Sequence, residues 1–276
     1  MQQLILDYTV MEAAKLESAL CGVLTGFALT IVVLIVQQWN VDRDLKHRPA
    51  RMLIEACLNL FVTAFFGGLL SSYLYVFASI ENQFNERAAF CMLPGSVTMM
   101  LTCILFLLGI SRILAAYSHS SNVLKISNFI AYTGICSCLL FTTYGTVSLY
   151  TVMHGTDEYT LVTTGSLLRI LAFLGPYPMA ISALALFFAH RVAGPRKSAS
   201  LRLRNLNPFL VCVVLLCIVM GTALMIGRVL PNRLFGNIPL GVMYAQELLM
   251  CVMAGWAFSF VPNSRPPKVK LGAGNG

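Results

Sequence analysis

The sequence predicts an all-α, polytopic membrane protein with seven transmembrane helices, its N-terminus outside and its C-terminus in the cytoplasm. Composition is the first reason: 58% of the 276 residues are hydrophobic and only 11% are charged, whereas a soluble domain carries about 25% charged residues. The apolar residues also gather in stretches long enough to cross ~30 Å of hydrocarbon as helices. Lys and Arg, finally, are concentrated in alternate connections between these stretches. A soluble domain and a disordered chain are both excluded.

Seven stretches have roughly the 20 apolar residues that a transmembrane helix requires. We expect helices because a helix satisfies its own backbone hydrogen bonds in lipid, and the alternating pattern of barrel strands is absent. Arg169 is the only charged residue in the fifth stretch and Glu247 the only one in the seventh; the other five stretches contain none. The predicted spans are residues 19–36, 56–80, 88–110, 126–153, 161–189, 209–227 and 238–260.

The chain divides into an extracellular or interfacial segment (residues 1–18), a seven-helix transmembrane domain (19–260) and a basic, Pro- and Gly-rich cytoplasmic tail (261–276). The N-terminal segment is acidic, unlike the basic start of a cleaved signal peptide, so the first span is expected to be a retained signal anchor. The segment is either a short interfacial helix or a frayed terminus. One face of such a helix would be lined by Leu4, Ile5, Val10, Met11 and Leu16.

The orientation follows from the positive-inside rule. Of the 19 Lys and Arg residues, 14 lie after the first, third, fifth and seventh spans, 4 lie on the opposite side, and Arg169 lies inside the fifth span. The connection after the third span contributes Arg112 and Lys125 to the larger group. Topology therefore accounts for the net charge of +8, and no nucleic-acid partner is expected. The expected location is the plasma membrane.

Five cationic residues follow the fifth span within residues 190–205. Beside a membrane, each attracts anionic lipid by about 1 kcal/mol, so we expect contact with anionic lipid at the cytoplasmic face. The alternative is that the run only signals orientation. The candidate lipid-contact residues are Arg191, Arg196, Lys197, Arg202 and Arg204.

Residues for the common intramembrane chemistries are missing from the sequence. The four histidines fall in connections or at span ends, no predicted span contains Asp, and no HExxH motif is present. These absences argue against haem ligation, zinc chemistry and paired-aspartate catalysis. All nine cysteines lie within predicted spans, which does not support a disulfide framework. We therefore expect no metal, no cofactor and no enzymatic activity.

Arg169 and Glu247 are the ionisable residues inside predicted spans, where a charge is costly and usually serves a function. At ~1.5 Å of helix per residue, they lie about 12 Å and 13–14 Å from the outer ends of their spans, so their depths match. We expect the two to pair across the fifth and seventh spans. The pair would be either structural or a site where a ligand or a proton exchanges with it. Tyr244 and Gln246 add hydrogen-bonding groups nearby in the sequence.

The run Gly175-Pro176-Tyr177-Pro178 predicts a kink or a break in the fifth span. Pro176 and Pro178 lack an amide hydrogen, and each proline ring clashes with the preceding helical turn. Broken helices mark binding sites in transporters, but inert kinks also occur.

Small residues in two spans predict close contacts between helices, because they let backbones approach one another. They are Gly22 and Gly26 in the first span and Gly67, Gly68, Ser71 and Ser72 in the second.

Seven spans with an outside N-terminus resemble the layout of G-protein-coupled receptors and of seven-helix sugar transporters. The motifs of the receptors are absent, however. Ser111-Arg112-Ile113 stands where the receptors carry Glu/Asp-Arg-Tyr, and no Asn-Pro-x-x-Tyr closes the seventh span. The shared layout therefore assigns no family and no function.

Three functions remain open from the sequence. The leading expectation is a non-enzymatic, receptor-like sensor or regulatory binding protein. Its connections are too short for an extramembrane domain, so its output must pass through a membrane or cytoplasmic protein partner. The first alternative is a small transporter with its site near the fifth-span break and the Arg169–Glu247 pair. The second is an accessory subunit of a larger membrane complex.

Overall fold

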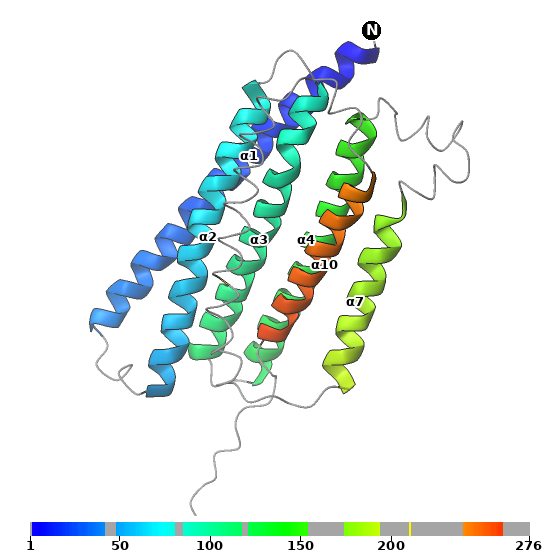
Figure 1. Cartoon of the computed structure of the whole chain (residues 1–276). Coiled ribbons are helices and arrows are strands. Elements are labelled where there is room, and N and C mark those ends of the chain that lie inside the picture. Colours follow the sequence, from blue (N-terminus) through cyan, green and yellow to red (C-terminus); the bar gives the residue numbers. More distant parts are fainter. Residues whose placement is uncertain are drawn as a thin grey trace, which may run out of the picture.

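The computed structural model describes residues 2–41, 48–80, 85–117, 121–153, 174–193, 210 and 240–261, and the regular structure within these ranges is α-helical. The all-α expectation is therefore confirmed for the described residues. The helices are α1 (Gln2–Val41), α2 (Arg48–Ile80), α3 (Asn85–Tyr117), α4 (Ser121–Met153), α7 (Pro176–Ala193) and α10 (Leu240–Phe260) (Figure 1).

Five of these helices are long and apolar enough to cross a membrane, as expected of an integral membrane protein. Their apolar segments match the predicted first, second, third, fourth and seventh spans. These segments are Val10–Gln38, Ile54–Ile80, Ala88–Leu114, Lys125–Thr151 and Gly241–Phe260. α7 contributes a shorter apolar segment, Pro176–His190, which covers the second half of the predicted fifth span. The predicted sixth span lies outside the described residues except for Leu210, so the number seven stays a prediction.

α1 is longer than the predicted first span. It begins at Gln2 and continues without interruption past residue 18, so the predicted N-terminal segment and the first span belong to one helix. Residues 2–18 are helical as the start of α1 and do not form a separate short helix, and their place at the membrane interface stays a prediction. At ~1.5 Å per residue, its 40 residues extend about 60 Å, which exceeds the hydrocarbon thickness of a bilayer.

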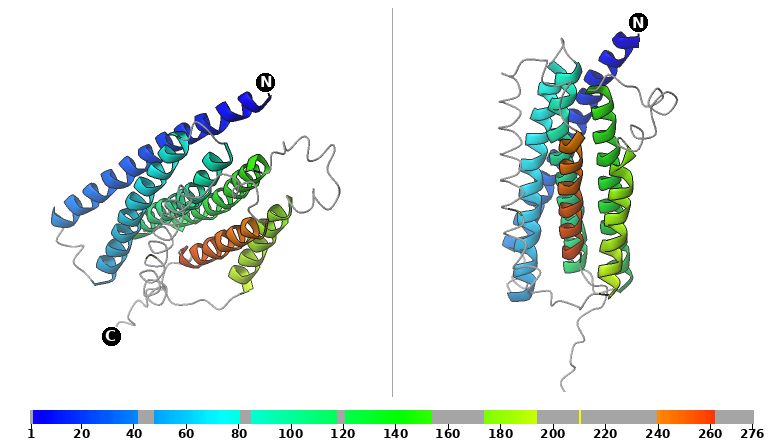
Figure 2. Two further views of the ribbon diagram at one scale, coloured as in Figure 1. Left: turned by 45° about the horizontal axis from the view of Figure 1, so that its top comes forward. Right: turned by 45° about the vertical axis from the view of Figure 1, so that its right-hand side comes forward.

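The helices pack as a bundle in which α1 lies against α2, α2 against α3, and α3 against α4 (Figure 1). α10 contacts both α3 and α4, and α7 contacts α4 and α10, as two further views show (Figure 2). α7 and α10 run in the same direction, because Gly175 lies against Tyr244 and Phe187 lies against Gly255. The end of α7 and the start of α10 therefore lie at opposite ends of the bundle.

Small residues on α2 let α3 approach it closely, as the sequence predicted. Ser71 Oγ and Thr98 Oγ1 form a hydrogen bond of 2.7 Å. One turn away, a Cβ added to Gly67 would lie only 2.6 Å from Thr102 Oγ1. A larger residue at position 67 would therefore push α3 away from α2.

The other small residues of α2 face α1. Ser72 Oγ and Ser18 Oγ lie 3.0 Å apart in a hydrogen bond. A Cβ added to Gly68 would clash with Thr25 Oγ1. Each pair of small residues is spaced by four positions, so each pair shares one face of α2. One pair faces α3 and the other faces α1.

The prediction of a close contact at Gly22 and Gly26 is wrong for the described helices. A Cβ added to either glycine would have no described heavy atom within 4 Å. α1 packs on α2 through Ser18 and Thr25, whereas neither glycine reaches a described neighbour. Among the exposed side chains of α1 is Phe27, next to Gly26, as expected of a helix facing lipid.

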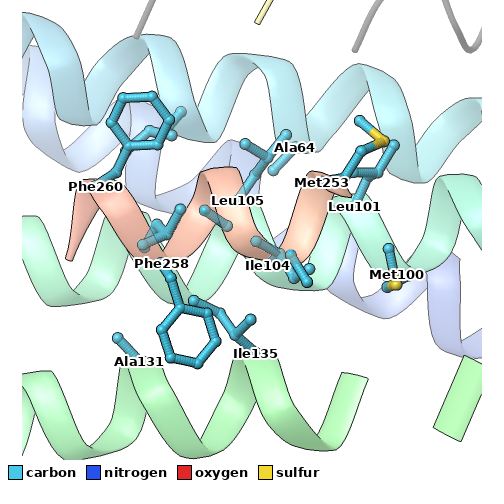
Figure 3. Close-up of a cluster of buried hydrophobic side chains, with 14 of the residues drawn as sticks. Ala64, Met100, Leu101, Ile104, Leu105, Ala131, Ile135, Met253, Phe258 and Phe260 are labelled. Atoms are coloured by element: carbon cyan, nitrogen blue, oxygen red, sulfur yellow. The ribbon is translucent and has the colours of Figure 1, made fainter. Parts of the chain in front are cut away.

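The main buried core extends through all six described helices and includes the region where α10 packs against α3 and α4. Figure 3 shows Ile104 and Leu105 of α3, Ile135 of α4 and Phe258 of α10 gathered in this region. All four side chains are buried. Apolar packing at these positions joins α10 to α3 and α4.

Aromatic side chains join α7 to this core. The rings of Phe188 and Phe258 meet edge to face, with centroids 5.0 Å apart. Tyr132 of α4 lies 5.3 Å from Phe258 and 5.8 Å from Phe188, measured between ring centroids. Such pairs contribute about 0.5–1.5 kcal/mol each beyond their burial. They hold one end of α4, α7 and α10 together.

Candidate functional site

Glu247 is the most unusual side chain of the described bundle. It lies ~10 Å along α10 from Leu240, at about 1.5 Å per residue, and its exposed fraction is 0%. An ionisable group at such a position in a membrane span is expensive and is usually kept for a function. The groups around it therefore define the candidate site.

One oxygen of the Glu247 carboxyl group has described partners and the other has none. Thr143 Oγ1 of α4 lies 2.7 Å from Glu247 Oε1. The Cys251 thiol, one turn later in α10, lies 3.8 Å from the same oxygen. Glu247 Oε2 has no hydrogen-bond partner among the residues that the structure describes. The carboxyl group is thus held through Oε1, and Oε2 remains available.

A second hydrogen bond joins α10 to α4 beside the first. Gln246 Nε2 donates to Thr146 Oγ1 at 3.3 Å. Thr143 and Thr146 are both fully buried and lie three residues apart, on one face of α4. We refer to Glu247, Gln246, Thr143 and Thr146 as the Glu247 cluster. It is a polar contact between two membrane-spanning helices.

Tyr244 connects α10 to the start of α7. A Cβ added to Gly175 would clash with the Tyr244 hydroxyl group and would lie 2.8 Å from the ring carbon Cζ. Tyr244 precedes Glu247 by three residues, so the two side chains are neighbours along α10. The absence of a side chain at Gly175 is what allows this close approach.

α7 begins at the position where the sequence predicts a break. Leu174 is helical, Gly175 lies in a turn, and the Met179 backbone N–H donates to the Gly175 carbonyl oxygen at 3.4 Å. Pro176 and Pro178 both fall in the first turn of α7. Amide groups in a first turn have no partner inside the helix, so the missing hydrogens cost no helical hydrogen bond.

The chain matches no model of a known protein family, no curated protein and no solved structure. What the Glu247 cluster does is therefore inferred from its own geometry.

The structure places some of the predicted site residues together and leaves others undescribed. Glu247, Gln246 and Tyr244 lie within one turn of α10, and two of them contact α4. Arg169 lies outside the described residues, so its pairing with Glu247 stays a prediction.

One of the predicted lipid-contact residues belongs to a described helix. Arg191 is in the last turn of α7, at the end that leads into the basic run. Four others lie outside the described residues: Arg196, Lys197, Arg202 and Arg204. Lipid contact by this run stays a prediction.

Sequence reasoning missed Thr143 and Thr146. Threonine in a membrane helix usually bonds its own backbone, as Thr142 does with the carbonyl oxygen of Leu139 at 3.0 Å. The signal was present as the run Thr142-Thr143-Tyr144-Gly145-Thr146, which places two hydroxyl groups on one face of the fourth span.

Arg112 was expected in the connection after the third span, and this expectation is wrong. It belongs to α3, its exposed fraction is only 6%, and its Nη2 group donates to the carbonyl oxygen of Phe260. The third span thus continues past its predicted end. A charged residue can lie there because a helix terminus offers carbonyl groups without intrahelical partners.

The Glu247 cluster brings several hydrogen-bonding groups together in the interior of the bundle. It combines one carboxyl group, one amide and two hydroxyl groups, which can hold a proton, a cation or a hydrogen-bonding ligand. Within the described helices, no three His, Cys, Asp or Glu side chains lie close enough to hold a metal ion.

Proposed function

We propose that the chain is a non-enzymatic integral membrane protein of the sensor or regulatory type, which binds a ligand at the Glu247 cluster. The observation that carries this proposal is the fully buried Glu247 carboxyl group, whose Oε2 has no partner among the described residues. Leaving a buried acceptor without a partner costs about 1–3 kcal/mol. A ligand that presents a positive charge or a hydrogen-bond donor would recover this energy.

The proposal includes seven crossings of the plasma membrane, with the N-terminus outside and the C-terminus in the cytoplasm. The parallel course of α7 and α10 supports it, because the chain must return between them from one end of the bundle to the other. Residues 209–227, the predicted sixth span, lie in that part of the sequence. The excess of Lys and Arg after the odd-numbered spans supports the orientation.

Packing gives a route by which binding at the Glu247 cluster would reach a partner. Tyr244 lies against Gly175 and Phe187 lies against Gly255, so a shift of α10 displaces α7. The basic run of residues 190–205 begins at the end of α7. A ligand that moves α10 would thereby change how this run meets anionic lipid or a membrane or cytoplasmic protein.

A small transporter is the second candidate, and the start of α7 favours it. The turn at Gly175 and the first turn of α7 lie beside Tyr244, within one helical turn of Glu247 along α10. Interrupted helices next to a buried charge are typical of transporter binding sites. Under this alternative, α7 gates access to the Glu247 cluster from the two sides of the membrane.

Cysteine accessibility separates these functions. Single cysteines replace Arg169, Leu174 and Ala180 in a chain that lacks the native nine, and a membrane-impermeant thiol reagent is applied from each side. Phe141→Cys is the matched control, since Phe141 is exposed on the outside of α4 and would face lipid. Labelling from one side supports a binding site, and labelling from both sides supports transport. No labelling contradicts both and favours an accessory subunit.

A further inference from the structure

The hydrogens in the contact between Thr143 and Glu247 can be counted. A threonine hydroxyl group carries one hydrogen and therefore donates one hydrogen bond. Thr143 Oγ1 lies at hydrogen-bond distance from two oxygens, the Leu139 carbonyl at 2.8 Å and Glu247 Oε1 at 2.7 Å. A backbone carbonyl only accepts hydrogen bonds. The two contacts therefore share one hydrogen unless Glu247 supplies a second.

Two assignments of hydrogens are available. If Glu247 is ionised, the single Thr143 hydrogen is shared between Glu247 Oε1 and the Leu139 carbonyl oxygen, and each contact is weaker for it. If Glu247 is protonated on Oε1, Glu247 donates to Thr143 and Thr143 donates to Leu139. The protonated form gives each contact its own hydrogen, whereas the ionised form has to share one hydrogen between two acceptors, as Thr142 does between the carbonyl oxygens of Cys138 and Leu139.

The surroundings of Glu247 agree with the protonated form. The side chain is fully buried, and burying an ionised carboxylate costs far more than burying a neutral acid. From α4 it meets the Thr143 hydroxyl group, and from α10 itself the Cys251 thiol. Tyr244, the next ionisable group along α10, packs against Gly175 near the start of α7. In the described part of the chain, no hydrogen bond or ion pair links Glu247 to a cationic side chain of α3, α4 or α7.

We propose that Glu247 is a proton-binding site whose carboxylic acid keeps its proton while α4 and α10 are in contact and releases it when that contact opens. On release, the O–H bond at Oε1 breaks and the proton passes to water. Thr143, no longer beside the carboxylate, keeps its hydrogen bond to the Leu139 carbonyl oxygen in its own helix. No electron is transferred. This inference goes beyond the proposed function, because the proton binds whether or not another ligand does.

Infrared spectroscopy of the full chain in lipid tests the protonation state directly. At neutral pH we expect the carbonyl stretch of a protonated carboxylic acid in the wild type and its loss in Glu247→Gln. Glu12→Gln is the control: Glu12 pairs with Lys15 at 2.9 Å near the N-terminus, and its replacement leaves the band in place. Identical spectra of the wild type and Glu247→Gln in this region would mean an ionised Glu247. That result overturns the proposal and favours the ion pair with Arg169.

A pair of threonine variants tests the geometry without changing Glu247. Thr143→Val removes the acceptor of the Glu247 proton, so the carbonyl stretch moves to higher wavenumber. Thr142→Val removes a hydroxyl group that bonds the carbonyl oxygens of Cys138 and Leu139 in its own helix, and leaves the band unmoved. A band that stays in place in Thr143→Val, or that moves equally in both variants, overturns the assignment. The measurement needs no ligand, so it can fail or succeed independently of the thiol-labelling test.

Discussion

The Arg112 guanidinium group of α3 donates a hydrogen bond to the end of α10. Arg112 Nη2 donates to the carbonyl oxygen of Phe260, which is 148 residues later in the chain. This carbonyl group belongs to the last turn of α10, where no amide of the same helix can reach it. Nearby on α3, Ser111 Oγ is joined to Ser127 Oγ of α4 at 3.0 Å. The end of α3 thus organises the ends of two other helices.

Arg112→Leu should lower the thermal stability of the chain in detergent. The substitution leaves the Phe260 carbonyl without this donor, which costs about 1–3 kcal/mol. Lys125→Leu is the control, because Lys125 is exposed at the start of α4 and its loss should change stability by less than about 0.5 kcal/mol. Equal melting temperatures for the two variants would show that the hydrogen bond contributes nothing.

The sequence alone marks Glu247 as a candidate site residue, but it does not reveal the side chains that form hydrogen bonds with it. A charged residue in an apolar stretch is visible in the sequence, because it breaks the composition of its surroundings. The partners Thr143 and Thr146 are not visible in this way, since threonine is common in membrane helices and its partner depends on which helix lies opposite. Arg112 was misplaced for a related reason. Its acceptor is a backbone carbonyl, which any residue could supply.

At the scale of elements, α2 depends on small residues far more than α1 does. Thr25 packs directly against Gly68, whereas no described residue packs against Gly22 or Gly26. The sequence showed small residues in both helices. Whether the small residues of a helix lie in a contact depends on how that helix is rotated about its axis. A membrane helix has apolar side chains on all its faces, so its sequence does not determine this rotation.

Gly68→Val should destabilise the packing of α1 on α2, because the new side chain would overlap Thr25. Overpacking of this kind costs about 1–3 kcal/mol. Gly26→Val is the matched control one helix away, and we expect no loss of thermal stability, since no atom of the described residues lies within 4 Å of the added Cβ. A loss in Gly26→Val equal to that in Gly68→Val would show that the exposed face of α1 is occupied by a partner.

Gly175→Ala should disturb the contact between α7 and α10. The added methyl group would overlap the Tyr244 hydroxyl group, at a cost of about 1–3 kcal/mol. Adding Tyr244→Ala should recover part of that loss, so the two substitutions should be non-additive in a double-mutant cycle of unfolding free energies. Purely additive effects would place the two residues out of contact.

At the scale of the whole molecule, the sequence predicted the class of protein and most of its membrane helices. Apolar stretches and their lengths are local properties, so five predicted spans match described helices. Which helices touch is not a local property. The contacts of α10 with both α3 and α4 arise from side-chain shapes in three helices at once.

The seven-span topology predicts on which side each connection lies. Single cysteines at Leu230 and Lys270 should be labelled by an impermeant reagent from opposite faces, outside for position 230 and cytoplasmic for position 270. A cysteine at Ala199 should be labelled from the same face as position 270. Labelling of positions 199 and 230 from one face would mean that residues 209–227 do not cross the membrane.

The bond between Arg112 and Phe260 also has a consequence for biosynthesis. A ribosome completes α3 long before it reaches α10, since 148 residues separate the two partners. During that interval the Arg112 guanidinium group must be hydrated or bonded elsewhere, because the carbonyl group it will meet has not yet been made. α10 therefore supplies the hydrogen-bond acceptor that Arg112 of α3 requires. A chain that is truncated before Phe260 lacks both an apolar helix and the acceptor for Arg112. We expect the cell's quality control to retain it more strongly than a chain that lacks only an apolar helix.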